Sequence, residues 1–230
     1  MEKLLLMLQL QNELNEATSG SKWTTGVTDK KKEINWRRCI YMECAEIVDS
    51  FAWKHWKSID KEPDYENIKI EIVDIWHFVM SLAIEQYEQN MLGGVDELAI
   101  AVSNMECFSS IDAPTKKFSS SKEIIEACEE LIAMMVSQNS VDLDDLLELF
   151  FKLVLMCELN LDSLYRLYVG KNVLNQFRQD HGYKEGTYNK EWNGIEDNVV
   201  MKKVWEESGD IAPSNLYKEL AKMYTALHKK

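Results

Sequence analysis

The sequence predicts an all-α helical bundle, and three observations support this. The chain contains only three prolines and nine glycines in 230 residues. Between them, apolar residues recur every three to four positions, which is the period of a helix and not of a strand. Two consecutive helical segments also contain paired carboxylates, E-x-x-E in the first and E-x-x-D in the second. We therefore expect a helical bundle with a metal site between those two helices.

The expected helices follow from their apolar spacing and from the breaks between them. The run LLLMLQLQ lies in the first helix, CIYMECAEIV in the second and IKIEIVDIWHF in the third. The Gly-Gly pair at 93–94 separates the third helix from the fourth, and SSIDAPTKKFSSS is the clearest loop. The expected bounds are 2–17, 33–57, 64–91, 94–108, 121–138, 141–179, 196–207 and 214–228.

The length of the chain supports one large hydrophobic core. We expect a single domain over residues 1–230, with a smaller helical section around residues 93–140. The apolar run LLELFFKLVLMCELNL, residues 146–161, is a candidate both for this core and for an interface.

Composition excludes several classes of function. The chain has 39 Asp and Glu against 26 Lys and Arg, a net charge of −13, which repels nucleic acid. Five scattered cysteines without a C-x-x-C pair predict neither a disulfide framework nor a structural zinc site. The first residues include Glu2 and lack a small-residue cleavage motif, and no apolar run is long enough to cross a membrane. We expect a cytoplasmic protein that binds neither nucleic acid nor membrane.

Four acidic residues form two pairs, Glu43 with Glu46 and Glu71 with Asp74. Residues three apart on a helix share a face, so either pair alone is typical of a solvated surface. Both pairs lie in apolar stretches, however, where a charge needs a partner. If the two helices pack antiparallel, the four carboxylates converge and need divalent cations as compensation. Ligands that are all oxygen suit Mg²⁺, with Mn²⁺ as a substitute.

The succession of E-x-x-E and E-x-x-D resembles the signature of the all-α nucleoside triphosphate pyrophosphohydrolases, which include MazG-like proteins and dimeric dUTPases. Three stretches are similar to the dimeric dUTPase branch, namely WRRCIYMECAEIVDSFAWKHWK, IEIVDIWHF and KNVLNQFRQDHGYKEGTYNKEWNGIEDN. The resemblance extends from the first helix to about residue 198. It is weakest between residues 93 and 140.

This resemblance implies an enzyme that uses Mg²⁺ to hydrolyse dUTP to dUMP and pyrophosphate, and that also accepts dUDP. Such an activity limits uracil in DNA and supplies dUMP for thymidylate synthesis. The resemblance assigns the metal to Glu43, Glu46, Glu71 and Asp74. Either Glu43 or Glu46 would orient the attacking water and accept its proton, and we prefer Glu46. A homodimer is also implied.

A second group of predicted site residues begins near residue 171. Lys171, Asn175 and Arg178 share one helical face, and a glycine-punctuated stretch follows them. On its own, this pattern is typical of a charged helix end and a surface loop. The resemblance implies contacts with the phosphates, sugar or nucleoside for Lys171, Asn175, Arg178, Tyr183, Lys190 and Asn193.

The uracil site is expected at the first helix, which the resemblance makes part of the base pocket. Gln11 and Asn15 are amides one turn apart, and Trp53 follows Glu46 by about two turns on the carboxylate face, where it could stack on the base or sugar. The alternative is that both amides lie on the surface and that Trp53 is a core residue. We assign Trp23, Trp56 and Trp76 to packing, and we expect His77 to be a core residue or a neighbour of the metal ligands and not a ligand itself.

Three alternatives stay open. Asp74 and His77 approximate the Glu-x-x-His element of di-iron carboxylate bundles, but the second such element is missing. A non-enzymatic helical interaction protein would have solvated acidic faces and no dependence on divalent metal. A pyrophosphatase for dCTP or other nucleotides is the nearest alternative within the same superfamily.

Overall fold

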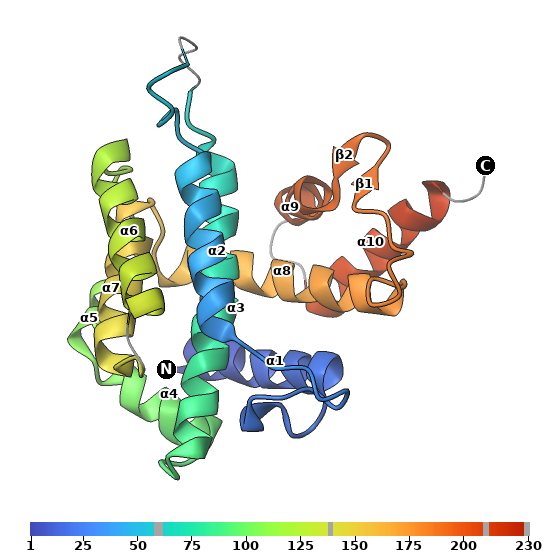
Figure 1. The fold of residues 1–230 in the computed structure, drawn as a ribbon. Helices are drawn as coiled ribbons and strands as arrows, with labels where there is room; N and C mark the ends of the chain where they lie inside the picture. The colour runs from blue at the N-terminus through green and yellow to red at the C-terminus, as the bar shows by residue number, and fades with distance from the viewer. Residues whose placement is uncertain (58–61, 138–139, 209–211, 228–230) are drawn as a thin grey trace. The chain divides into compact units, whose positions relative to one another are not determined.

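The computed structural model describes residues 1–57, 62–137, 140–208 and 212–227. The structure is 69% helical, with ten α-helices among these residues and one short hairpin (Figure 1). The predicted all-α class is therefore confirmed. The chain divides into two compact units, Met1–Tyr165 and Arg166–Lys230. The expectation of a single domain over residues 1–230 stays a prediction.

The first unit contains seven helices, a 3₁₀ turn and the start of an eighth helix among its described residues. These elements are α1 (Glu2–Ser19), η1 (Trp23–Thr25), α2 (Trp36–Asp49), α3 (Tyr65–Gln89), α4 (Val95–Ser103), α5 (Glu106–Ser110), α6 (Ser121–Ser137), α7 (Leu143–Met156) and α8 (Leu161–Asp180). The second unit contains the remainder of α8, then β1 (Glu191–Trp192), β2 (Ile195–Glu196), α9 (Asp197–Ser208) and α10 (Pro213–Leu227).

Helices α2 and α3 lie side by side in the first unit, and α6 packs against α2 (Figure 1). The N-cap of α2 is Asn35, whose side chain accepts a hydrogen bond from the backbone of Arg38, and Asp64 caps α3 in the same way. Asn67 donates a hydrogen bond of 3.1 Å to the Ser50 hydroxyl, which joins the end of α2 to the start of α3. The two helices therefore run antiparallel, as the metal-site prediction requires.

The core of the first unit forms where α3 meets α7. Trp76 is 1% exposed, and its ring stacks on Phe150 with centroids 4.9 Å apart and planes 8° apart. Phe151 and Leu146 are fully buried beside them. Most of the apolar run at 146–161 therefore belongs to the core of this unit.

Two predicted helices are each interrupted in the structure. The 94–108 helix divides into α4 and α5, and the 141–179 helix divides into α7 and α8. Asn160 and Ser163 cap α8 reciprocally, since each side chain accepts a hydrogen bond from the other's backbone N–H, at 3.0 and 2.9 Å. This capping pattern was present in the sequence and was missed. The predicted helix ends at 138 and 228 lie outside the described residues.

The prediction of a helix over 33–57 is wrong at its C-terminal end, because α2 ends at Asp49. The Ser50 hydroxyl bonds the Glu46 carbonyl at 3.1 Å, which closes the last turn. Trp53 and Trp56 therefore lie in the following loop, with exposed fractions of 43% and 62%. Trp56 does not pack in the core, and the helical phase assumed for Trp53 does not apply.

The hairpin of the second unit was also missed. Its strands pair Trp192 with Ile195, and Asn193 and Gly194 form the turn with φ angles of 54° and 80°. Two successive positive φ angles favour Asn-Gly in tight hairpins, so this dipeptide was an available signal.

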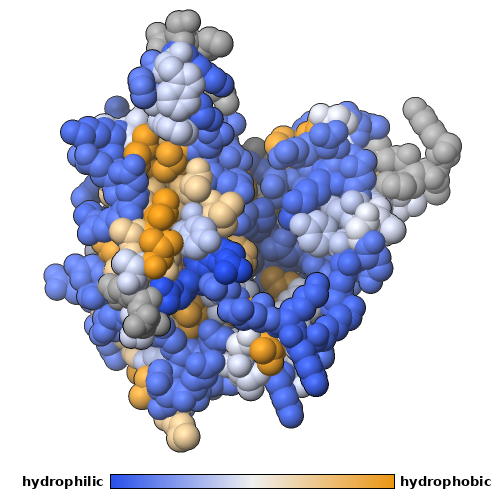
Figure 2. All heavy atoms as spheres, in the orientation of Figure 1, coloured by the Kyte–Doolittle hydropathy of each residue, from blue (hydrophilic) through white to orange (hydrophobic). Residues whose placement is uncertain are grey.

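The surface visible in Figure 2 is mostly hydrophilic, with an apolar strip in the region of α2 and α6. Exposed apolar residues on these helices include Met42 and Val136, at 49% and 59% exposed. None of the helices in the described ranges combines the length and the apolar composition that a bilayer crossing requires.

Two tryptophans that the sequence assigned alike to packing should differ in their contribution to stability. We predict that Trp76→Ala lowers the free energy of unfolding by about 3–5 kcal/mol, because it leaves a cavity against Phe150. Trp56→Ala should change it by less than about 0.5 kcal/mol, because this side chain is exposed. Urea denaturation of both variants measures these losses. Equal losses would contradict the packing described here.

Candidate metal and nucleotide site

Three carboxylates from two helices meet in the first unit. Glu43 and Glu46 of α2 and Glu71 of α3 each contribute an oxygen, and these oxygens lie within 4.8 Å of one another. The E-x-x-E spacing puts both glutamates of α2 on one face, and the α2–α3 packing brings Glu71 opposite. Asp74 is half-buried one turn further along α3 and lies outside this group of three. The structure therefore brings together three of the four predicted ligands.

The three carboxylates differ in exposure. Glu71 is buried at 7% exposed, Glu43 is half-buried and Glu46 is exposed. A buried carboxylate beside two others is opposed both by desolvation and by like-charge repulsion. Glu71 is therefore not part of a solvated acidic surface, which was the alternative interpretation of these carboxylates. Such a donor set, made only of carboxylate oxygens, can hold a hard divalent cation such as Mg²⁺.

The two amides predicted for the base site are buried in a polar cluster. Gln11 and Asn15 are 2% and 3% exposed, so the alternative that they are surface amides is wrong. The Gln11 Nε2 donates to Asn15 Oδ1 at 2.9 Å and to Ser81 Oγ at 3.1 Å, and Asn15 Nδ2 donates to Ser81 Oγ at 2.9 Å. The Gln11 Oε1 lies 2.6 Å from His77 Nδ1. These bonds fix the orientation of both amide groups.

Aromatic rings lie beside the face of α3 that carries Glu71 and Ser81. Trp36, at the start of α2, stacks on Phe78 with centroids 6.2 Å apart, and Trp23 packs edge-on against Trp36 at 5.7 Å. Phe78 follows Glu71 by seven positions and precedes Ser81 by three, so all three share one face of the helix. Along this face of α3, the carboxylate of Glu71, the ring of Phe78 and the hydroxyl that binds the two amides of α1 therefore follow one another.

Glu85 continues this face one turn beyond Ser81 and was not identified from the sequence. Its carboxylate lies close to Gly26, the residue with φ 79° that ends η1. Burial raises the pKa of this half-buried carboxyl to about 7, because desolvation disfavours its charged form. Glu85 therefore changes charge close to neutral pH.

Trp53 lies in the loop that follows α2. Its indole N–H donates to Asp49 at 3.3 Å, and its ring meets Trp56 edge-on at 5.5 Å. Lys54 forms an ion pair with Asp49, and this hydrogen bond lowers the pKa of the Asp49 carboxyl. The alternative that Trp53 is a core residue is wrong, because its ring is exposed.

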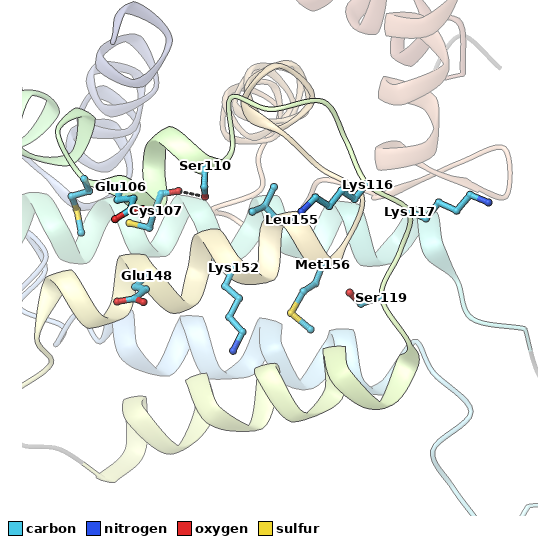
Figure 3. A pocket seen from close by; sticks show the side chains of 11 residues that line it. Glu106, Cys107, Ser110, Lys116, Lys117, Ser119, Glu148, Lys152, Leu155 and Met156 are labelled. Carbon is cyan, nitrogen blue, oxygen red and sulfur yellow. Dashed lines mark hydrogen bonds between the residues drawn. The ribbon is translucent and has the colours of Figure 1, made fainter.

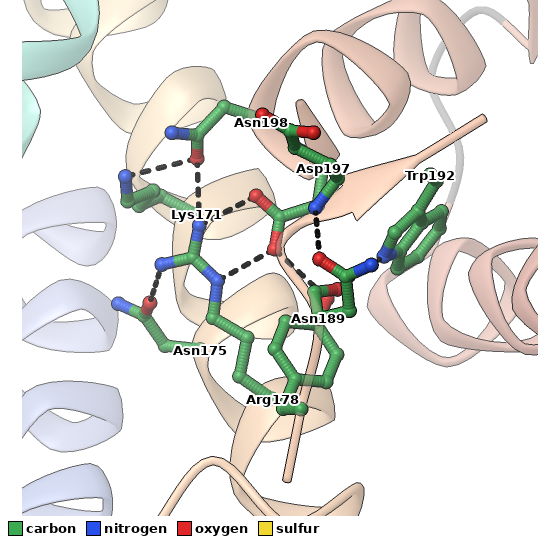
Figure 4. A network of polar contacts seen from close by, with 9 residues as sticks. Lys171, Asn175, Arg178, Asn189, Trp192, Asp197 and Asn198 are labelled. Carbon is green, nitrogen blue, oxygen red and sulfur yellow. Dashed lines mark hydrogen bonds and ion pairs between the residues drawn. The ribbon is translucent and has the colours of Figure 1, made fainter. Parts of the chain in front are cut away.

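Two of the predicted cations of the second unit, Lys171 and Arg178, belong to a buried network (Figure 4). Arg178 is 7% exposed and pairs with Asp197 through two bonds, Nε to Oδ2 at 2.8 Å and Nη2 to Oδ1 at 2.7 Å. Its Nη1 donates to Asn175 at 3.3 Å. Lys171, 4% exposed, donates to Asn198 at 3.0 Å. Three of the predicted residues are therefore brought together, with Asp197 and Asn198 as partners that the sequence did not identify.

The remaining predicted residues of this unit lie nearer the surface. The exposed Tyr183 ring has Arg178 5.9 Å and Lys190 5.5 Å from its centroid, which are cation–π distances. Asn193 lies in the hairpin turn, where its positive φ gives it a conformational role. A second tyrosine, Tyr188, also belongs to this network, although it was not identified from the sequence. Its hydroxyl donates a hydrogen bond to Asp197 at 2.8 Å. Burial and this bond raise the pKa of Tyr188.

A pocket of about 680 Å³ lies elsewhere in the first unit, among α5, α7 and the loop after α5. No residue predicted for metal or nucleotide lines it. Its lysines, Lys116, Lys117 and Lys152, point in different directions (Figure 3). They therefore do not form a common site for an anion.

Comparison with known proteins gives a family match over most of the chain. A family model described as dUTPase matches residues 3–183. The matched span covers well over half of the chain and includes the three clustered carboxylates, Lys171 and Arg178, whereas Asp197 lies beyond it. Among the curated proteins, none matches the chain.

The burial of Glu85 predicts a pH-dependent stability. An unfolded Glu loses its proton near pH 4.3, whereas folded Glu85 holds it to about pH 7. Stability should therefore fall as pH rises across this window and level off above it, because the folded state binds more protons there. Glu85→Gln should match the wild-type Tm near pH 4 and exceed it near pH 8. Thermal unfolding across this range, with Glu88→Gln on the exposed end of α3 as control, measures the difference. If the Tm difference between Glu85→Gln and wild type does not grow with pH, the raised pKa of Glu85 is contradicted.

Proposed function

Because the chain belongs to the dUTPase family and is a dUTP diphosphatase of the all-α type, we propose that it hydrolyses dUTP to dUMP and pyrophosphate with Mg²⁺ as its cofactor. The observation that supports this most directly is the group of carboxylate oxygens within 4.8 Å on α2 and α3. We also propose that dUDP is a substrate, which would yield dUMP and phosphate.

The donor set fits a hard divalent cation. Glu43, Glu46 and Glu71 would hold it, with Asp74 one turn further along α3 as the fourth predicted ligand. A bound Mg²⁺ neutralises charge on the phosphate oxygens and acidifies a coordinated water. Mn²⁺ is an expected substitute, because it takes the same oxygen ligands.

Glu46 is the proposed general base. It is the most exposed of the three clustered glutamates, so its carboxylate can reach a water molecule and an incoming nucleotide. Glu43 is half-buried on the same face of α2 and is the alternative base. Glu71 is buried and is better suited to holding the cation than to exchanging protons with solvent.

The proposed uracil site is the polar cluster of Gln11 and Asn15. A base edge needs donors and acceptors in fixed positions, and the bonds from these amides to Ser81 and His77 provide that rigidity. The exposed ring of Trp53 is proposed to stack on the base or sugar. Exclusion of the thymine methyl by pocket shape would contribute about 1–3 kcal/mol.

The cations of the second unit are proposed to contact the phosphates and sugar. Lys171 and Arg178 are held in the buried network, and Lys190 lies exposed beside Tyr183. A chain of net charge −13 needs such a local positive group to attract a polyanion. Asn175 and Asn193 complete the proposed nucleotide contacts.

The proposed cellular role is to limit uracil in DNA and to supply dUMP for thymidylate synthesis in the cytoplasm. A homodimer is proposed from the family resemblance. The exposed apolar residues Met42 of α2 and Val136 of α6 are candidates for contact with the second copy.

The activity is tested by pyrophosphate release from dUTP, dCTP, dTTP and UTP in the presence of Mg²⁺. We expect dUTP to be preferred, and we expect Glu46→Gln to lower kcat by about 10²–10⁴-fold, as loss of a general base does. Glu88→Gln, which removes an exposed carboxylate from α3, should retain wild-type activity. Equal turnover of the four nucleotides would exclude uracil selectivity, and full activity of Glu46→Gln would exclude Glu46 as the base.

A further inference from the structure

Asp197 is the most enclosed charged residue among those described in the second unit. Its side chain is 1% exposed at the first position of α9, directly after the hairpin. The carboxylate accepts two bonds from Arg178 and a third from the Tyr188 hydroxyl, all between 2.7 and 2.8 Å. A carboxylate with three short bonds from two residues has its position closely defined.

Asp197 and its neighbour Asn198 also contact Lys171 (Figure 4) and the backbone of Lys190. The Asp197 backbone N–H donates to the Lys190 carbonyl at 2.9 Å. The Asn198 Oδ1 accepts from Lys171 Nζ at 3.0 Å and from Arg178 Nη2 at 3.3 Å. The dipeptide Asp197-Asn198 is therefore bonded to Lys171, Arg178 and Lys190.

The burial of Arg178 explains why Asp197 matters. A guanidinium in a site that is only 7% exposed needs a counter-ion, because desolvation of an unpaired charge costs several kcal/mol. The two parallel bonds from Asp197 also fix the plane of the guanidinium, which a single bond would not do. Without the carboxylate, the guanidinium of Arg178 would lose its counter-ion and turn toward water.

We propose that Asp197 is a positioning residue for the reaction, which holds Arg178 directly and Lys171 and Lys190 indirectly in the orientation that meets the nucleotide phosphates. This inference rests on the proposed function, because it takes these cations to be phosphate ligands. Asp197 itself does not touch the substrate. Its effect is transmitted through the bonds that orient Arg178 and the hairpin.

The test compares Asp197→Asn with wild type in two measurements, kcat/KM for dUTP and the affinity for inorganic pyrophosphate with Mg²⁺. Misplacement of a catalytic or binding group by about 1 Å can cost 10²-fold, so we expect kcat/KM to fall by about that factor and pyrophosphate to bind more weakly. Tyr188→Phe removes one of the three bonds and keeps the ion pair, so a fall of several-fold is expected even where Asp197→Asn does not fold.

Asp180→Asn is a matched control. The Asp180 carboxylate also accepts a hydrogen bond from the Tyr217 hydroxyl at 2.7 Å and one from the Gln176 amide at 2.8 Å. Unlike Asp197, it is exposed, and within the described residues it pairs with no arginine. This variant should retain wild-type kcat/KM and pyrophosphate affinity.

A double-mutant cycle with Arg178→Lys separates positioning from simple stability. If Asp197 acts through Arg178, Asp197→Asn should lower kcat/KM much less in the Arg178→Lys background than in wild type.

The inference is overturned if folded Asp197→Asn and Tyr188→Phe keep wild-type kcat/KM and pyrophosphate affinity while only the Tm falls. A wild-type protein that binds pyrophosphate but does not hydrolyse dUTP would instead refute the proposed function, and the pyrophosphate measurement would still decide the role of Asp197.

Discussion

The close approach of carboxylates between α2 and α3 is the constraint on which the candidate site of the first unit depends. Glu43, Glu46 and Glu71 hold their oxygens within 4.8 Å, and Glu71 is only 7% exposed. The hydrogen bond between Asn67 and Ser50 joins the helices at one end, so the carboxylates cannot separate without loosening the packing. The proposed divalent cation would be attracted to this group of carboxylates, and its binding would therefore stabilise the fold as well as supply the chemistry.

The second unit contains a buried ion pair. Arg178 is buried, and its charge is balanced by Asp197 through a bidentate ion pair. A buried ion pair adds little net stability compared with apolar residues in the same place. We therefore attribute the role of this pair to the orientation that it imposes on the Arg178 guanidinium. Tyr188 and Asn198 extend that control to the hairpin and to Lys171. The buried ion pair of the second unit therefore determines how Arg178 is oriented.

The sequence predicted what depends on short-range periodicity and failed where side chains at the helix ends decide. The all-α class followed from helical spacing. The meeting of Glu43 and Glu46 with Glu71 followed from that spacing together with the assumption that the two helices pack antiparallel. The end of α2 did not, because Ser50 closes the helix although the apolar period continues. Likewise, no spacing rule relates Arg178 to Asp197, whose pairing depends on the chain reversal at the Asn-Gly turn. Burial of Gln11 and Asn15 required the packing of α1 against α3, which an isolated helix does not reveal.

The central claim is that the three carboxylates form a metal site, and titration with Mn²⁺ alone, followed by calorimetry, tests it most directly. Wild type and Glu88→Gln should bind the ion saturably, whereas Glu71→Gln, which removes the buried carboxylate, should bind at least about tenfold more weakly, since a lost charged ligand costs more than about 1.4 kcal/mol. Equal affinity in Glu71→Gln and wild type would contradict the account, because the ion would then be bound elsewhere.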